Sequence, residues 1–384
     1  MSAITIDSEL VHYEVLGRGR PVILIHGWLG SWRYWIPVMQ QLSANYRVYA
    51  LDLWGFGDSQ KNPARYSLQS QVNLLTQFME KLGINKAALV GHSFGAAIAI
   101  AFARRHEVLT SRIMTVSAPL FAINADALPM ASIAPKRATG IMSAVGNSTP
   151  AAASPTLVSN PTLTTAASAT PIQTSATVTG TVESSAPAVP NASPALSEPL
   201  SATMPGVTSD ETLRRNPFLD HPERLAQLGI TPPVPPPNPL AGLMSNIKPK
   251  ALLERQTIRD DAILSKLRDE VEKTDEVAVS ESVRSFAGVN LALELTYLTM
   301  PVLLLHGKSD PFLPAPEDDL LGRIGSAKTV GPLFPIVVPD FRHFPMLENT
   351  GKFNRLLMDF LDAKLTTDAQ VNLDLRDTWR RQLR

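Results

Sequence analysis

Short hydrophobic runs recur toward both ends of the chain, and each stops at a loop rich in glycine or polar residues. A run without polar interruption is typical of a strand that is buried on both faces of a parallel sheet. Runs of this kind predict strands at residues 21–25, 46–51, 87–90, 113–117, 302–305 and 334–338. Residues 10–16 alternate between apolar and polar positions instead, which predicts an edge strand or hairpin.

Helical spacing of apolar residues fills the intervals between these strands. It predicts helices at residues 32–42, 67–82, 96–105, 250–273, 277–286, 291–295, 317–324 and 353–365. Ser67 is a plausible N-cap for the second of these helices, and Gly83 stops it. Strands that alternate with helices indicate an α/β fold in which a mostly parallel central sheet is flanked by helices.

The middle of the chain breaks this order. Between residues 138 and 209 the only charged side chains are Glu183 and Glu198, and most others are Ala, Ser, Thr, Pro or Val without periodicity. Such a segment buries too little apolar surface to offset its chain entropy, so we expect it to be disordered. A mucin-like stalk is an alternative on composition, but it requires secretion. The proline run at residues 231–239 predicts a stiff polyproline II spacer, or else a segment that binds a protein partner.

Composition narrows the class of protein. The 384 residues are 44% hydrophobic and carry no formal net charge, which provides a large core but no basic surface for nucleic acid or an acidic membrane. The absence of cysteine excludes disulfides, thiol nucleophiles and cysteine metal sites. The first residues lack a secretory pattern, and the apolar stretch 87–103 is too short for a membrane span. We therefore expect a cytoplasmic protein that uses no cofactor or metal.

The sequence Gly-His-Ser-Phe-Gly at residues 91–95 lies between a predicted strand and a predicted helix. A serine hydroxyl is a weak nucleophile until a base activates it, and a sharp strand-to-helix turn would present the Ser93 hydroxyl to such a base. The backbones on either side of this turn pass closely, which favours glycine at positions 91 and 95. The same turn directs the backbone N–H of Phe94 toward a developing oxyanion.

A second loop with two glycines occupies residues 26–30, after the first buried strand. Ligands bind at the carboxyl ends of parallel strands, so the N–H of Trp28 is a candidate for the second oxyanion donor. His26 is an alternative base, but a role in shaping the loop through hydrogen bonds is favoured. Trp32 and Trp35 lie near the predicted mouth, where they would bind an apolar acyl or alcohol group, or else pack in the core.

Two further residues complete a candidate catalytic set with Ser93. Asp310 and His343 each follow a predicted parallel strand, so all three residues should meet at one edge of the sheet. In that arrangement His343 would take the Ser93 proton and return it to the leaving group, while Asp310 would fix the imidazole. Asp52 and Asp58 are alternative carboxylates, but turn-forming and backbone-capping roles are favoured for both.

These motifs closely resemble the α/β-hydrolase superfamily. By this resemblance, residues 26–28 look like the oxyanion loop, residues 52–59 look like the D-x-x-G-x-G-x-S loop, and residues 91–95 look like the nucleophile elbow. Asp310 would be the acid after the seventh strand and His343 the base after the eighth. Some relatives place the acid after the sixth strand, where Asp126 is the available carboxylate.

The resemblance also implies how the chain is divided. Residues 1–120 and 300–365 would form the two parts of the hydrolase core. Residues 121–299 would form a helical cap inserted between strands 6 and 7, with the low-complexity segment inside it. Residues 366–384 would be a charged C-terminal tail.

The nucleophile limits the reactions that this resemblance implies. Relatives that act as haloalkane dehalogenases or epoxide hydrolases carry aspartate at the elbow, so Ser93 disfavours both. Carboxylic esterase or lipase, thioesterase, acyltransferase, carbon–carbon bond hydrolase and cofactor-free haloperoxidase or perhydrolase remain, because fold alone does not choose among them. We expect hydrolysis of a small apolar ester. A non-catalytic binding protein is the alternative from another class, and an intact set of Ser, Asp and His argues against it.

Overall fold

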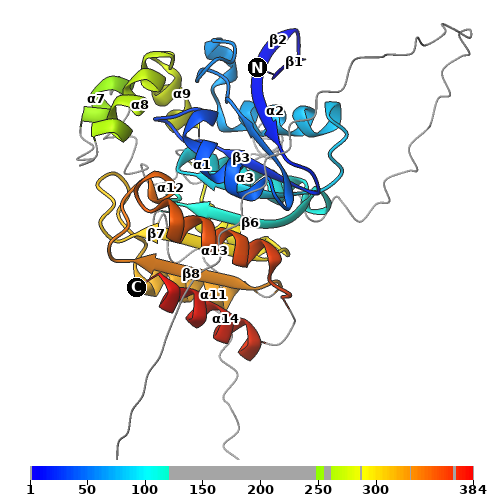
Figure 1. Cartoon of the computed structure of the whole chain (residues 1–384), viewed down its shortest axis with the longest axis vertical. Coiled ribbons are helices and arrows are strands. Elements are labelled where there is room, and N and C mark those ends of the chain that lie inside the picture. The colour runs from blue at the N-terminus through cyan, green and yellow to red at the C-terminus, as the bar shows by residue number, and fades with distance from the viewer. Residues whose placement is uncertain are drawn as a thin grey trace, which may run out of the picture. The chain divides into compact units, whose positions relative to one another are not determined.

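The computed structural model describes residues 2–120, 248–254, 261–285, 288–328, 330–365 and 369–383 (Figure 1). The predicted α/β architecture is confirmed, because these residues form an eight-stranded sheet flanked by helices. The low-complexity segment at 138–209, the proline run at 231–239 and Asp126 lie outside the described residues.

The sheet is mostly parallel. Its strands are β1 (Ser2–Ile6), β2 (Glu9–Leu16), β3 (Arg20–Ile25), β4 (Tyr46–Leu51), β5 (Ala87–His92), β6 (Thr110–Val116), β7 (Val302–Gly307) and β8 (Leu333–Val338). They lie in the order β1-β2-β4-β3-β5-β6-β7-β8, with antiparallel pairing as far as β4 and parallel pairing from β4 to β8. Strand β1 was not predicted from the sequence; apart from Ile6, its side chains are exposed or only partly buried.

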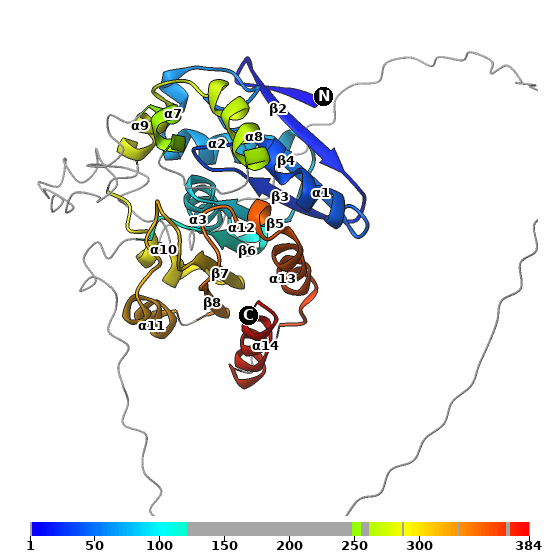
Figure 2. The same cartoon turned by 60° about the vertical axis from the view of Figure 1, so that its left-hand side comes forward.

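Helices cover both faces of the sheet (Figure 2). On one face α1 (Ile36–Leu42) packs against α13 (Thr350–Asp362); on the other, α3 (Phe94–Arg105) packs against α2 (Leu68–Lys81) and α10 (Leu291–Tyr297). The remaining core helices are α11 (Asp318–Ala327) and α12 (Pro345–Glu348), with short 3₁₀ segments η1 (Trp32–Trp35), η2 (Pro63–Arg65) and η3 (Glu107–Leu109). Among the described residues, no helix is long and apolar enough to cross a membrane.

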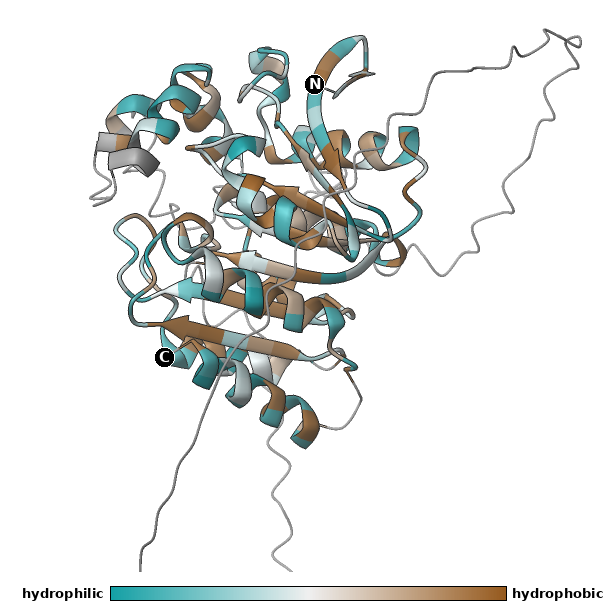
Figure 3. Ribbon diagram, in the orientation of Figure 1, coloured by the Kyte–Doolittle hydropathy of each residue, from teal (hydrophilic) through white to brown (hydrophobic). Residues whose placement is uncertain are grey.

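Hydrophobic strands between amphipathic helices account for this layering. In Figure 3, β8 is hydrophobic along most of its length, whereas α13 and α14 (Ala369–Gln382) alternate between hydrophobic and hydrophilic residues. Residues 22–25 of β3 have no exposed surface, as expected for a strand covered on both faces. The predicted parallel-sheet core is therefore confirmed for the strands that carry the candidate site.

The register of the parallel strands brings the functional loops to one edge of the sheet. At the strand ends the paired residues are Ile25 with Gly91, His92 with Val116, Val116 with Leu305, and Gly307 with Val338. The loops that follow β3, β5, β7 and β8 consequently begin beside one another. Residues separated by more than 300 positions in the sequence can meet there.

Three helices from the region between β6 and β7 contact the core. They are α7 (Pro249–Glu254), α8 (Asp261–Glu272) and α9 (Ala278–Ser285). The sequence predicted one helix over residues 250–273, but the structure has α7 and α8 on either side of residues 255–260, which lie outside the described residues. The backbone N–H of Leu68, at the start of α2, donates to Ser285 Oγ at 2.7 Å, which ties α9 to the core.

The C-terminal region differs from the expected charged tail. Residues 369–382 form α14, which packs on β8. Its one fully buried side chain is Trp379, which is 2% exposed, and the ring lies 5.0 Å from the ring of Phe334. Arg380 of the same helix also donates to Pro335 O of β8 at 2.8 Å. The burial of Trp379 could not be inferred from the charged residues around it.

Candidate active site

Ser93 lies on a strained turn between β5 and α3. Its backbone has φ 53° and ψ −116°, a conformation that costs a non-glycine residue about 1–3 kcal/mol. Glycine is required on both sides: a Cβ at Gly91 would lie 2.3 Å from the carbonyl oxygen of Gly95, and one at Gly95 would lie 2.3 Å from that of Ile25. The predicted elbow geometry is therefore present.

The Ser93 hydroxyl is buried and has no hydrogen-bond partner within the described part of the chain. The residue is 1% exposed, and its side chain does not cap the helix that follows. A buried hydroxyl ordinarily finds a partner, because an unsatisfied one costs about 1–3 kcal/mol. An exception at a strained turn is the pattern expected of a group kept for chemistry.

Asp310 and His343 form a buried pair. His343 Nδ1 lies 2.7 Å from Asp310 Oδ2, while Asp310 Oδ1 accepts the backbone N–H groups of Phe312 and Leu313 at 2.9 and 3.0 Å. Burial by itself raises the pKa of Asp310, but the His343 imidazole and the two N–H groups outweigh it and hold the pKa well below its usual range. The ionised carboxylate can only accept, so Nδ1 carries a proton, and in the neutral imidazole Nε2 is then the acceptor.

Two loops must meet to form this pair. The N–H groups of Lys308 and Ser309 donate to the carbonyls of Val338 and Phe341 at 2.9 and 3.2 Å, and the Ser309 hydroxyl donates to Pro339 O at 2.9 Å. These hydrogen bonds connect the loop after β7 to the loop after β8. The position of Asp310 relative to His343 is therefore set by the backbone as well as by the side chains.

His343 lies against the nucleophile elbow. Its ring centroid is 4.7 Å from that of His92, the residue before Ser93, and the rings of Phe312 and Phe344 lie at 5.0 Å on its other sides. The imidazole is 4% exposed. The structure thus places the Asp310–His343 pair beside His92, the residue before Ser93, with aromatic rings against the imidazole.

The loop after β3 passes directly beside Ser93. A Cβ at Gly27 would lie 2.6 Å from Ser93 Cβ, so the backbone leading to Trp28 touches the nucleophile. His26 lies beneath this loop: its Nε2 accepts the N–H of Leu53 at 3.0 Å, and its Nδ1 donates to Gly27 O at 2.8 Å. Burial lowers the pKa of His26. With both ring nitrogens occupied, His26 shapes the loop, as favoured from the sequence.

The two residues expected to supply oxyanion donors also pack against each other. The rings of Trp28 and Phe94 are stacked, with centroids 5.5 Å apart and planes 9° from parallel. The Trp28 indole N–H donates to Ser282 Oγ of α9 at 2.8 Å. No local sequence pattern indicates this role of Ser282, because 254 residues separate it from Trp28.

Trp32 and Trp35, expected at the mouth of the site or in the core, both make packing contacts. Trp35 has no exposed surface, and its ring lies 6.3 Å from that of Phe353 in the core. The ring of Trp32 packs near His12 at 5.7 Å and beneath the Arg33 guanidinium. The complete burial of Trp35 fits packing, the second of the two roles considered from the sequence, whereas substrate binding by the partly buried Trp32 stays a prediction.

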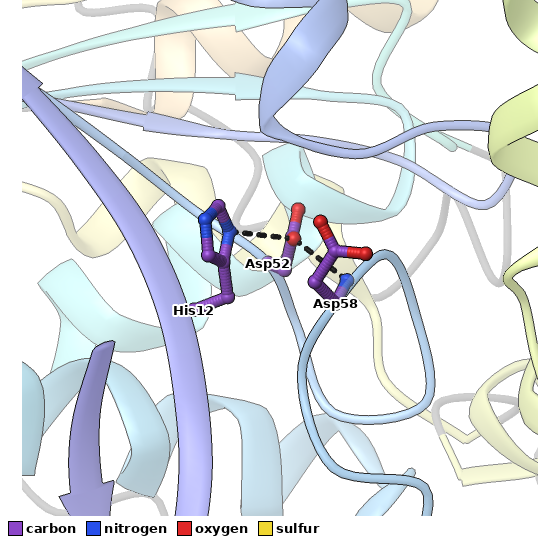
Figure 4. A group of neighbouring side chains, drawn as sticks. All are labelled: His12, Asp52 and Asp58. Atoms are coloured by element: carbon purple, nitrogen blue, oxygen red, sulfur yellow. Dashed lines mark hydrogen bonds and ion pairs between the residues drawn. The ribbon is translucent and has the colours of Figure 1, made fainter. Parts of the chain in front are cut away.

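Asp52 and Asp58 belong to a separate cluster with His12 of β2 (Figure 4). Asp52 Oδ1 accepts the N–H of Trp32 at 2.8 Å, and Oδ2 accepts the Asp58 N–H at 2.9 Å and His12 Nδ1 at 3.0 Å. Asp58 pairs with Arg33 at 2.8 Å. Although three such groups could in principle hold a metal ion, both oxygens of Asp52 are already occupied. Backbone capping, favoured from the sequence, is the observed role of Asp52, whereas the Asp58 carboxylate forms ion pairs with Arg33 and Lys273.

Comparisons with known proteins agree with this geometry. Residues 20–170 match a family model described as alpha/beta hydrolase fold. The chain is 36% identical over 107 residues to a 2-hydroxy-6-oxo-2,4-heptadienoate hydrolase of Pseudomonas putida (27% of this chain, 39% of that protein). It is 32% identical over 108 residues to a soluble epoxide hydrolase of Corynebacterium sp. (28% of this chain, 38% of that protein). The matches thus span about two fifths of these relatives.

Solved structures share the fold at low sequence identity. An esterase from Exiguobacterium antarcticum superposes with a TM-score of 0.55 at 15% identity, covering 94% of this chain and 98% of that one. A bromoperoxidase from Bacillus anthracis gives 0.53 at 18% identity, covering 94% and 99%. The sheet, the elbow and the Asp–His pair define an α/β protein with a serine at the nucleophile position. The chain has the α/β-hydrolase fold.

Proposed function

We propose that this protein is a serine hydrolase that cleaves a carboxylic ester, or a related acyl bond, through an acyl-enzyme on Ser93. His343 Nε2 takes the Ser93 proton as the hydroxyl attacks the carbonyl carbon, and returns it to the leaving alcohol. Asp310 holds Nδ1–H and stabilises the imidazolium. Water then repeats the attack on the acyl-enzyme with the same base, which releases the acid and restores Ser93.

One observation carries the proposal. The Ser93 hydroxyl is buried without a hydrogen bond at a strained turn, and the ring of His343, fixed by Asp310 at 2.7 Å, packs against the preceding residue. A serine with a purely structural role would have a hydrogen-bond partner. A histidine with a purely structural role would not need a carboxylate that holds Nδ1 and leaves Nε2 free to accept a proton. The backbone N–H groups of Trp28 and Phe94 complete the proposal as oxyanion donors, each worth about 3–4 kcal/mol.

The surroundings favour an apolar substrate. The stacked rings of Trp28 and Phe94 belong to the two residues whose N–H groups would face the carbonyl oxygen, so apolar surface adjoins the reacting group. Phe312 and Phe344 flank the base. We therefore propose a small ester with an apolar acyl or alcohol group.

Carbon–carbon bond hydrolysis is the second candidate. It is favoured by the Pseudomonas putida relative, whose name describes hydrolysis of a 2-hydroxy-6-oxo-dienoate and which shares 36% identity over the matched stretch. The epoxide hydrolase relatives support no such extension, because the aspartate expected at the elbow of those enzymes is Ser93 here.

A fluorophosphonate probe and a substrate panel test the proposal. The parent should be labelled and should hydrolyse chromogenic esters of graded acyl length, whereas Ser93→Ala should fold but lose both properties. Ser43→Ala is the matched control, because it is a substitution of the same type at a serine whose hydroxyl bonds only to Gln40 O among the described contacts. Faster turnover of a 2-hydroxy-6-oxo-dienoate than of any ester would favour the second candidate. A folded parent that neither labels nor turns over either substrate would indicate a binding protein.

A further inference from the structure

Two buried polar side chains near the site have no part in the proposed chemistry. Tyr34, from η1, is 5% exposed, and His92, from the end of β5, is 1% exposed. Neither group reaches the solvent, and neither is one of the three catalytic residues. Most buried polar groups are hydrogen-bonded, so the partners of Tyr34 and His92 indicate which parts of the site these two side chains hold in place.

Tyr34 and His92 form a continuous chain of hydrogen bonds across the site. The N–H of Gly27, in the oxyanion loop, donates to the Tyr34 hydroxyl oxygen at 2.6 Å. The hydroxyl lies 3.0 Å from His92 Nδ1, and His92 Nε2 lies 2.8 Å from the backbone carbonyl oxygen of His343. The chain therefore joins the oxyanion loop, the residue before the nucleophile and the residue that carries the base.

The proton positions in this chain are determined. Burial raises the pKa of Tyr34 well above its ordinary value and lowers that of His92 well below, so both groups stay neutral. A carbonyl oxygen can only accept, so His92 Nε2 carries the imidazole proton, and Nδ1 accepts from the Tyr34 hydroxyl. That hydroxyl in turn accepts from Gly27 N–H. With both side chains neutral, every donor has one acceptor, and no other arrangement satisfies all three bonds.

The loop sequence makes room for this chain. A Cβ at Gly30 would lie 1.9 Å from Cε1 of the Tyr34 ring, so only glycine lets the ring reach Gly27. The same ring is held edge-on against His26 and His92, with centroids 6.3 and 5.5 Å away. The second glycine of the loop, noted in the sequence for its backbone, thus serves the placement of Tyr34.

From this geometry we propose that Tyr34 and His92 are positioning residues that hold the oxyanion loop and the base in register with Ser93. The proposal rests on the serine hydrolase function above. His343 is then fixed at two points: Asp310 holds the ring at Nδ1, and His92 holds the main chain at the carbonyl, where the Ser117 hydroxyl also donates at 3.4 Å. Gly27, one residue before the donor N–H of Trp28, is fixed by Tyr34.

The proposal predicts a loss of rate rather than a loss of substrate affinity. Tyr34→Phe keeps the ring but removes the central atom of the chain, which frees the Gly27 N–H and His92 Nδ1. Displacements of a fraction of an ångström at the oxyanion donor and the base should lower kcat by about 10- to 100-fold. KM should stay nearly constant, because neither group contacts the remote part of the substrate.

Time-resolved labelling by a fluorophosphonate separates positioning from folding. The final labelled fraction counts intact sites, while the rate constant reports how well Ser93, His343 and the oxyanion donors are aligned. Tyr34→Phe should label to the parent's final fraction at a rate about 10- to 100-fold lower. Tyr49→Phe removes the same atom from a tyrosine that is 3% exposed on β4 and should label at the parent rate.

A double variant of Tyr34 and His92 gives an independent test of the positioning role. His92→Asn should slow labelling as well, and the double variant should be no slower than about the slower single variant, because both changes break one chain. Parent-like rates for Tyr34→Phe, a reduced final fraction at an unchanged rate, or rates that multiply in the double variant would each overturn the positioning role. A folded parent that does not label would overturn the serine hydrolase function itself, which the other outcomes leave intact.

Discussion

Replacement of Asp310 by asparagine should remove catalysis through the tautomer of His343. Both N–H groups of Phe312 and Leu313 point at one carboxylate oxygen, at 2.9 and 3.0 Å, so the asparagine must place its oxygen there. Its amide NH₂ then occupies the position of Oδ2, 2.7 Å from Nδ1. The imidazole can avoid two donors facing each other only by moving its proton to Nε2, the nitrogen needed to accept the Ser93 proton.

The expected loss in kcat is about 10⁴-fold, the size seen when a triad aspartate becomes asparagine elsewhere, and it corresponds to about 5.5 kcal/mol in the barrier. Loss of a charge-assisted hydrogen bond should lower the free energy of unfolding by about 1.5–3 kcal/mol at neutral pH. Because the pKa of Asp310 is lowered by folding, this stability is present above the unfolded pKa of about 3.9 and is lost as the pH falls toward the folded value. The stability gap between parent and variant should therefore be constant above about pH 5 and shrink in acid.

The assay is hydrolysis of a chromogenic ester, with kcat normalised to folded protein, together with urea unfolding between pH 3 and 7. Asp340→Asn, at an exposed aspartate of the neighbouring loop, is the matched control and should leave both quantities unchanged. A folded Asp310→Asn variant within tenfold of the parent kcat would refute the tautomer argument. If Asp126→Asn alone lowered kcat by orders of magnitude, the acid would be the alternative carboxylate considered from the sequence.

Two further predictions concern the elbow and the low-complexity segment. Gly95→Ala should lower the free energy of unfolding, measured in urea, by more than about 2 kcal/mol, because the new Cβ would lie 2.3 Å from Ile25 O. The control is Gly322→Ala in α11, where no atom lies within 4 Å of the Cβ position. This variant should raise the free energy of unfolding by up to about 1 kcal/mol. Equal midpoints for the two variants would contradict the close-approach argument. Replacing residues 148–205 with a short Gly-Ser linker should leave Tm and small-ester turnover almost unchanged, because each doubling of loop length costs only about 0.6 kcal/mol. If the replacement prevented folding, the expectation of disorder from the composition of this segment would be wrong.

The sequence alone was sufficient where the chemistry is local. Ser93 and its two glycines form one turn, and the turn requires small residues wherever backbones touch, so the pentapeptide predicts its own geometry. Asp310 and His343 could be placed because parallel strands end at a common edge, which converts chain order into proximity. The favoured roles of His26 and Asp52 also followed from local polar patterns, and their hydrogen bonds confirm them.

Tertiary structure decided the roles of the other residues, because the same side chain can be placed in several different environments. Trp35 is apolar enough for a substrate pocket or a core, and only the packing of Phe353 from α13 shows that it belongs to the core. Trp379 docks α14 because β8 offers an apolar surface, which nothing in the residues around it reveals. The hydrogen bonds of His92 span 58 and 251 residues, so its role exists only once β5, η1 and the loop after β8 have been brought together.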